Sequence, residues 1–259
     1  MLVLLPPSEG KAGAVRGAPF DPGALSSPEL GPAREAVLDE LVELCAGDEV
    51  KAREVLGLSE RQGAEMARNA ALRSAPARPA GDIYTGVLYD ALDLASLDTA
   101  ARRRARASLL VFSGLWGVVR ITDRIPAYRC SGGVRLPGLG ALAAHWRGPL
   151  ASVLPAVAGE GPVLDLRSSA YAAMWRPAGE VADRTVTVRV LQSRIVDGVE
   201  RRSVVSHFNK ATKGRLVREL LLAGPLPRTP RRLVEALRDL GYRVEEAAPG
   251  RLDVVVTEL

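Results

Sequence analysis

The sequence lacks any apolar run close to the roughly 20 residues that a membrane-spanning helix needs. The first five residues are apolar, but no basic segment precedes them and Pro6-Pro7 follows at once. A secretory signal has a different pattern, so residues 1–5 predict a buried strand. We therefore expect a protein without a membrane partner.

Cysteine is scarce as well. Cys45 and Cys130 are the only two, and they are far apart with no CxxC or Cys/His spacing. This excludes a disulfide framework and offers no ligand cluster for zinc. The sequence thus predicts a protein of a reducing compartment, the cytoplasm, with no metal and no other cofactor.

Lysine is nearly absent from a chain of 259 residues with a net charge of +5. The four lysines are Lys11, Lys51, Lys210 and Lys213. Arginine supplies general surface charge, but it cannot replace a compact amine whose pKa is easily tuned. Three of the four lysines lie in glycine-flanked segments, which makes them candidates for a functional site. The positive charge is compatible with a polyanionic partner, although a composition rich in Ala, Arg, Gly and Pro also explains it.

Hydrophobic periodicity predicts helices and strands along the whole chain. The expected helices are 33–46, 50–58, 59–72, 87–92, a basic helix capped by Asp98, 139–157 with an interruption near Gly148-Pro149, 209–222 and 229–240. The expected strands are 2–5, 109–112, 163–166, 185–196, 199–206, 242–247 and 252–257, with a hairpin turn at Asp197-Gly198. Without repeats or linkers, this order predicts an α+β fold: a single compact domain over 1–259, with a mixed sheet and flanking helices.

The segment Pro6-Pro-Ser-Glu-Gly-Lys11 follows the first expected strand. A loop that contains glycine and then presents a lysine resembles phosphate-binding loops, in which backbone N–H groups and an ammonium meet an anion. It is not a Walker loop, because the first glycine and the Ser/Thr after the lysine are missing. A purely structural loop is the alternative.

A second glycine-rich segment is Ser113-Gly-Leu-Trp-Gly117. In a helix-hairpin-helix module, two such glycines let backbone amides approach DNA phosphates. Arg120 and Arg129 follow closely and would add positive charge. The alternative is a tight turn beside a core strand, with Trp116 packed inside.

The richest segment is Ser206-His-Phe-Asn-Lys-Ala-Thr-Lys-Gly-Arg215. If Asn209 caps a helix, Lys210 and Lys213 share one face and the helix dipole adds to their charge. Together with Arg215 they would form an anion site. A solvated basic face is the alternative.

Catalytic residues are less clearly marked. No nucleophile motif such as GxSxG accompanies His145 and His207, and His145 is expected to be structural. Polar residues that gather at loop ends are nevertheless typical of enzyme sites. The candidates for catalysis are Lys11, Tyr84, Ser168, His207 and Lys210.

Five segments in this order resemble the YaaA family of peroxide stress proteins. They are 4–11, 81–86, 113–120 with 126–129, 164–171 and 206–214. The resemblance implies a cytosolic α+β protein with a basic cleft, a helix-hairpin-helix element and affinity for double-stranded DNA. It also implies a link to hydrogen peroxide survival and to lower free intracellular iron.

Carried over by position, the resemblance makes the Gly114–Gly117 turn the hairpin. It makes the cleft's cations Lys11, Arg120, Arg129, Lys210 and Lys213. The alternative is an enzyme that acts on a nucleotide or on another small molecule bearing a phosphate or a carboxylate, in the same lysine-lined pocket. Direct iron binding has no ligand cluster in its favour.

Overall fold

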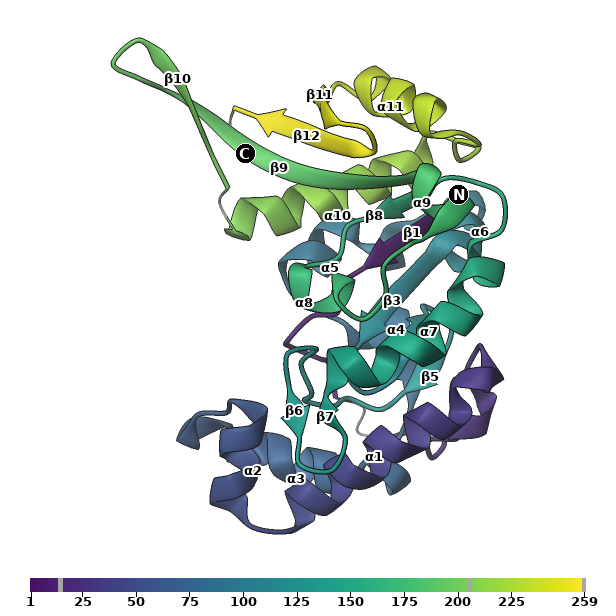
Figure 1. The fold of residues 1–259 in the computed structure, drawn as a ribbon, viewed down its shortest axis with the longest axis vertical. Coiled ribbons are helices and arrows are strands. Elements are labelled where there is room, and N and C mark those ends of the chain that lie inside the picture. The colour runs from purple at the N-terminus through teal and green to yellow at the C-terminus, as the bar shows by residue number, and fades with distance from the viewer. Residues whose placement is uncertain (14–15, 205, 258–259) are drawn as a thin grey trace.

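The computed structural model describes residues 1–13, 16–204 and 206–257, and at 196 and 206–208 it describes the backbone alone. Within this part of the chain, an eight-stranded sheet has the order β11-β12-β9-β8-β1-β3-β4, and β10 pairs with β9 (Figure 1). Its strands are β1 (Leu2–Leu5), β3 (Leu109–Ser113), β4 (Gly117–Arg120), β8 (Val163–Asp165), β9 (Thr185–Val196), β10 (Val199–Ser203), β11 (Arg243–Ala248) and β12 (Arg251–Val256).

The central strands of the sheet are parallel. β1 pairs in parallel with β3 and β8, and β9 does so with β8 and β12, whereas β4, β10 and β11 are antiparallel to their neighbours. Every residue of β1 and β3 is buried, because a parallel strand inside a sheet covered on both faces hides all its side chains. The prediction of a buried first strand is therefore confirmed.

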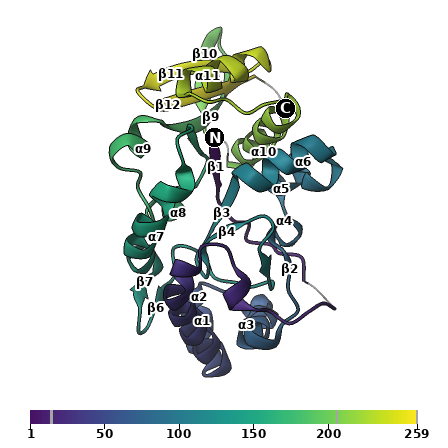
Figure 2. The ribbon, with the colours of Figure 1, turned by 90° about the vertical axis from the view of Figure 1, so that its right-hand side faces the viewer.

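Helices cover both faces of the sheet. Figure 2 shows α7, α8 and α9 on one side of β1 and β3, with α5, α6 and α10 on the other. Their bounds are α5 (Val87–Leu92), α6 (Thr99–Ser108), α7 (Leu142–Ala158), α8 (Ser169–Ala172), α9 (Gly179–Asp183) and α10 (Ser206–Leu222). α10 packs so closely on α5 that a Cβ atom at Gly214 would collide with the carbonyl oxygen of Leu88.

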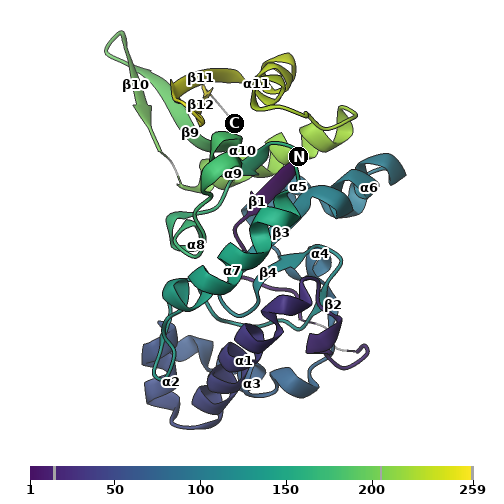
Figure 3. The ribbon, with the colours of Figure 1, turned by 45° about the vertical axis from the view of Figure 1, so that its right-hand side comes forward.

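A helical layer lies at the end of the molecule away from β9–β12 (Figure 3). It consists of α1 (Gly31–Ala46), α2 (Glu49–Leu56) and α3 (Gly63–Ala70). The buried Arg34 of α1 donates to the carbonyl oxygens of Trp116 (3.1 Å) and Val118 (2.8 Å), which ties this layer to the β3–β4 turn. The remaining elements are β2 (Arg78–Pro79), α4 (Ala80–Ile83), β5 (Arg124–Ile125), β6 (Arg135–Leu136), β7 (Gly140–Ala141), α11 (Pro230–Asp239) and short 3-10 turns at 22–24, 28–30, 60–62, 72–74 and 94–96.

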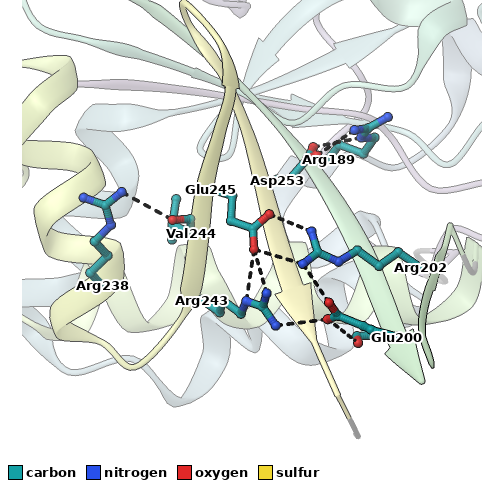
Figure 4. A network of polar contacts seen from close by, with 9 residues as sticks. Arg189, Glu200, Arg202, Arg238, Arg243, Val244, Glu245 and Asp253 are labelled. Atoms are coloured by element: carbon teal, nitrogen blue, oxygen red, sulfur yellow. Dashed lines mark hydrogen bonds and ion pairs between the residues drawn. The ribbon is translucent and has the colours of Figure 1, made fainter. Parts of the chain in front are cut away.

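The β9–β10 hairpin extends away from the body of the molecule (Figure 1). At its turn, Asp197 and Gly198 have φ of 53° and 77°, as expected for the Asp-Gly hairpin predicted from the sequence. Two ion pairs link β10 to β11: Arg202 pairs with Glu245 at 2.6 Å, and Arg243 pairs with Glu200 at 3.0 Å (Figure 4). Hydrogen bonds from Ser193 and Arg202 lower the pKa of the Glu200 carboxyl to about 2.

The predicted α+β class, with one compact domain, a mixed sheet and flanking helices, is confirmed. The Asp98 cap is confirmed too, since its carboxylate accepts from the backbone N–H of Ala101 at 2.7 Å. Several boundaries differ from the predicted ones. α7 continues through Pro149 without the predicted interruption, and α10 begins at Ser206 rather than at Asn209. The predicted strand 199–206 is shorter, since β10 ends at Ser203.

No helix among the described residues is both long and apolar enough to cross a membrane.

Candidate functional site

The candidate site lies at the carboxyl edge of the parallel strands. Since β1, β3 and β8 run in the same direction, the segments that follow them meet at one edge of the sheet. In open sheets with parallel strands, ligands bind in the crevice outside this edge. The residues after β1 and β8 belong to two of the segments singled out in the sequence, 4–11 and 164–171.

The loop after β1 is fixed to the segment around Tyr84. The hydroxyl of Tyr89 donates to the carbonyl oxygen of Pro6 at 2.7 Å, and the Thr85 N–H donates to the Ser8 hydroxyl at 3.1 Å. Lys11 forms an isolated antiparallel bridge with Tyr84. These contacts join two segments that are more than seventy residues apart, as the 77-residue separation of Ser8 and Thr85 shows.

A cavity of about 330 Å³ opens beside this loop. Prolines, Leu88 and the rings of Tyr89 and Tyr171 make one part of its wall apolar, whereas hydroxyl groups and one amine supply the polar part. The lining residues are Pro6, Pro7, Ser8, Glu9, Gly10, Thr85, Gly86, Val87, Leu88, Tyr89, Ser168, Tyr171 and Lys210. An apolar wall with a few polar groups is the usual make-up of a small-molecule site.

Lys11 lies behind this loop in a half-buried position. Its Nζ atom donates to the carbonyl oxygen of Ser8 at 2.7 Å and stands 4.2 Å from the centre of the Tyr128 ring. Burial lowers the pKa of the Lys11 amine to about 8, because the charged form loses hydration; the nearby Glu9 carboxylate opposes this effect.

Tyr84, a candidate for proton transfer, is buried in the core. Its hydroxyl is 3.0 Å from that of Tyr128, which is 2.7 Å from the Ser113 hydroxyl. Burial raises the pKa values of both tyrosines, so both remain neutral hydrogen-bonding groups. Tyr84 does not line the cavity described above, and it positions the loop rather than facing a ligand.

Arg129 also contacts this loop. Its guanidinium pairs with the Glu9 carboxylate at 2.9 Å, and Glu9 lines the cavity. The Asn69 side chain accepts from the backbone N–H of Arg129 (2.8 Å) and donates to its carbonyl oxygen (2.7 Å). No sequence pattern marks Asn69, because its role depends on a contact 60 residues along the chain.

Lys210 and Lys213 both reach the carboxyl edge from α10. Lys210 is exposed and lines the cavity, while Lys213 donates to the carbonyl oxygen of Leu166 at 3.1 Å. Burial lowers the pKa of Lys213, and the Asp165 carboxylate opposes this. Because α10 begins at Ser206, both lysines lie beyond its first four residues, and the predicted contribution of the helix dipole is wrong for them.

Asp165 and Arg167 form a buried ion pair next to Lys213 that sequence analysis missed. Arg167 donates to the two carboxylate oxygens of Asp165 at 2.8 and 2.6 Å, and its guanidinium lies 4.3 Å from the centre of the Phe112 ring. It also donates to the carbonyl oxygens of Tyr171 (3.2 Å) and Trp175 (3.0 Å). The pair therefore fixes the segment that carries Ser168 into the cavity.

The Gly114–Gly117 segment is a β-hairpin turn between β3 and β4, so the helix-hairpin-helix interpretation is corrected. The whole turn is buried. A Cβ atom at Gly114 would lie 2.7 Å from the carbonyl oxygen of Cys130, and one at Gly117 (φ +70°) would lie 2.7 Å from the Trp146 ring. The glycines allow close packing, and their amides are not available to a phosphate.

Two of the predicted cations lie away from the carboxyl edge. Arg120 pairs opposite Leu110, at the amino end of β3, and Arg215 lines a different cavity between α10 and β11–β12. The side chain of His207 lies outside the described residues. His145 is half-buried, with Nε2 3.0 Å from the carbonyl oxygen of Ala33, in line with its expected structural role.

The fold and the position of this cavity define an α+β protein whose candidate site lies at the carboxyl edge of a mixed sheet. A family model described as "Peroxide stress protein YaaA" matches residues 1–248. The chain belongs to the YaaA family.

Three relatives match most or all of the sequence. A UPF0246 protein of Streptomyces coelicolor is 69% identical, with 100% of both chains covered. A UPF0246 protein of Corynebacterium efficiens is 42% identical over 95% of both chains. An uncharacterized protein of Campylobacter jejuni is 26% identical over 84% of this chain and 83% of its own.

Proposed function

We propose that this chain acts in the peroxide stress response by binding a small molecule with a phosphate or carboxylate group at the carboxyl edge of its sheet. The observation that carries the proposal is the meeting of Ser8, Thr85, Ser168 and Lys210 around one cavity of about 330 Å³. This volume is at the lower end of the range for small-ligand pockets. The exposed Lys210 amine is the group that attracts the anion.

A cytoplasmic location is part of this proposal. It is supported by the free thiols of Cys45 and Cys130, since a reducing compartment keeps cysteines in this form.

Ligand-induced thermal stabilisation tests the proposal. At about ten times its Kd, a ligand that binds only the folded chain should raise the Tm by roughly 3 °C. Inorganic phosphate, nucleotides and small keto acids are the first probes. Lys210→Ala should abolish the shift, whereas the matched control Lys51→Ala, on the distant helix α2, should retain it. The absence of a shift with every probe, or an equal loss in both variants, contradicts the proposal.

Double-stranded DNA is the second candidate ligand, and limitation of oxidative damage and of free iron would follow from its binding. The net charge of +5 and the exposed Arg215, which lies away from the cavity, support it. A cavity of this volume cannot admit a duplex, so DNA would contact only its rim and the surface around it. The four cations at or near the carboxyl edge, Lys11, Arg129, Lys210 and Lys213, would then form part of a basic surface.

Salt dependence separates the two candidates. Duplex binding through phosphates weakens steeply, by roughly 100-fold or more between about 50 and 200 mM salt when several phosphates are neutralised. Fluorescence anisotropy with a labelled duplex measures this. Steep salt dependence without any nucleotide-induced Tm shift would make DNA the ligand, while the reverse result favours the small molecule.

A further inference from the structure

A second cavity, of about 410 Å³, lies between α10 and the strands β11 and β12. It shares no lining residue with the cavity at the carboxyl edge. Its wall is both charged and apolar: the charged side chains are Arg215, Glu219 and Arg243, and the apolar ones include Leu240, Val255 and Val256. The volume is at the lower end of the range for small-ligand pockets, so the cavity suits a small molecule with both polar and apolar parts.

Arg215 and Glu219 bring opposite charges to this cavity from one helix. They are four residues apart in α10, so they share a face of the helix with a rise of about 6 Å between them. Within the described part of the chain, Arg215 makes no hydrogen bond and no ion pair within 4.0 Å, not even with Glu219. Both charges act on the hydroxyl group of Tyr242, which also lines the cavity: burial raises the pKa of this phenol, the Glu219 carboxylate raises it further, and Arg215 opposes the rise. One cation and one anion therefore face the same small space.

The other charged group of the wall is already paired. Arg243 contacts the carboxylates of Glu200 at 3.0 Å and Glu245 at 2.9 Å (Figure 4), which leaves Arg215 as the cation available to a ligand. Thr212 precedes Arg215 by three residues on the same helix face and lines the cavity, and its buried hydroxyl oxygen has no hydrogen-bond partner among the residues that the structure describes. Since buried polar atoms are nearly always hydrogen-bonded, this hydroxyl is suited to a partner from outside the chain.

We propose that this cavity binds a free α-amino acid with an apolar side chain. The carboxylate of the ligand pairs with Arg215, its ammonium group pairs with Glu219, and its side chain packs against Leu240, Val255 and Val256. The two charged groups of an α-amino acid are attached to one carbon atom, so they can bridge two long side chains that are one helical turn apart. A simple anion would lie close to the Glu219 carboxylate without neutralising it, and a simple cation would do the same at Arg215.

L-leucine is the probe that tests the proposal. An NMR titration of the full chain at pH 7 measures the Kd of leucine and of two analogues that each lack one charge. 4-Methylpentanoate has no ammonium group, and 3-methylbutylamine has no carboxylate. We expect each analogue to bind at least about tenfold more weakly than leucine, because each leaves one charged side chain without its partner. An analogue that binds as tightly as leucine, or no leucine binding up to about 10 mM, overturns the proposal.

Two variants assign the charged groups. Arg215→Gln and Glu219→Gln should each weaken leucine binding at least about tenfold, while the Kd of 4-methylpentanoate should rise only in Arg215→Gln. The matched controls are Arg103→Gln on α6 and Glu54→Gln on α2, which change exposed residues away from this cavity and should keep the leucine Kd of the parent chain. Unchanged leucine binding in either cavity variant, or an equal loss in the controls, refutes the proposal.

This inference goes beyond the proposed function, because the two cavities have separate lining residues. The leucine carboxylate could also bind at the carboxyl-edge cavity, and Lys210→Ala distinguishes the two sites. If Lys210→Ala weakened leucine binding as much as Arg215→Gln does, the amino acid would occupy the carboxyl-edge cavity, and a site between Arg215 and Glu219 would be refuted.

Discussion

At the residue scale, Lys11 holds its charge where water only partly reaches it. The fall of its pKa from 10.5 to about 8 means that the folded chain binds this proton less tightly than the unfolded chain. The corresponding cost to stability is at most about 3 kcal/mol and is fully present below pH 8. It diminishes as the pH rises from 8 towards 10.5. The hydrogen bond to Ser8 and the Tyr128 ring offset part of it.

We therefore expect Lys11→Met to be as stable as the parent chain at pH 7, or more stable by up to about 2 kcal/mol. The advantage should shrink between pH 8 and pH 10. Urea denaturation at pH 7 and pH 10 measures both effects. A variant destabilised by more than about 1 kcal/mol at pH 7 would mean that the amine stabilises the fold, contrary to this reasoning.

Single residues of the candidate site differ in how far the sequence could identify them. Lys11 and Lys210 could be identified as candidates, because few lysines remain in a chain rich in arginine. Lys11 ends the loop that follows β1, and Lys210 lines the cavity beside that loop. Arg167 could not, because nothing in its local sequence distinguishes a buried arginine, paired with Asp165 at 2.6 Å, from one at the surface. Asn69 could not be identified either, because its side chain bonds the backbone of Arg129, 60 residues further along the chain, and no local pattern indicates this contact.

At the scale of elements, the contact between α10 and α5 depends on Gly214. Alanine in a helix is usually favoured over glycine by about 1 kcal/mol. At Gly214, however, the added methyl group would collide with the carbonyl oxygen of Leu88 and lie 2.9 Å from the Cβ atom of Ala91. We expect Gly214→Ala to lower the free energy of unfolding by about 3 kcal/mol.

Gly63→Ala is the matched control for this prediction. Gly63 also lies in a helix, α3, but the nearest atom beyond its chain neighbours to a Cβ there is Glu49 Oε1, at an ordinary 3.7 Å. This variant should be neutral or more stable by about 0.5–1 kcal/mol in the same urea denaturation. Equal effects of the two substitutions would disprove a close α10–α5 contact.

Elements with a strong local signal were predictable. The Asp197-Gly198 turn is one, because its positive φ angles suit few other residue pairs. The Gly114–Gly117 turn was not, since glycine pairs serve equally in a module that exposes amides to phosphate and in a hairpin packed against Trp146. Only the atoms packed against the turn, the Cys130 carbonyl oxygen and the Trp146 ring, distinguish a buried hairpin from a phosphate-binding turn.

At the scale of the whole molecule, the order of the strands lay beyond sequence analysis. Local patterns give the strands and their approximate ends, but they do not say that β8 and β3 flank β1. This order brings the carboxyl ends of β1 and β8 together and thereby creates the candidate site. Pairing over such separations is decided by the packing of complete faces, which a local window does not contain.

The central sheet joins residues from the beginning, middle and end of the chain, so we expect residues 1–259 to unfold as one cooperative unit. Far-ultraviolet circular dichroism and tryptophan fluorescence should give the same urea midpoint. The fluorescence is informative because Trp116, Trp146 and Trp175 are all buried. Separate midpoints, with the helices α1–α3 lost first, would instead divide the chain into two domains.

The position of β1 has a consequence for synthesis on the ribosome. Leu4 pairs with Leu110 and with Asp165, which are translated later, so β1 has to wait for both partners. Until they emerge from the ribosome, the apolar residues of β1 remain exposed to chaperones and to other nascent chains. Such distant pairings also slow folding, because a long loop has to close before any contact forms. Pairing of β1 with both of its neighbours is therefore expected only after Asp165 has left the ribosome.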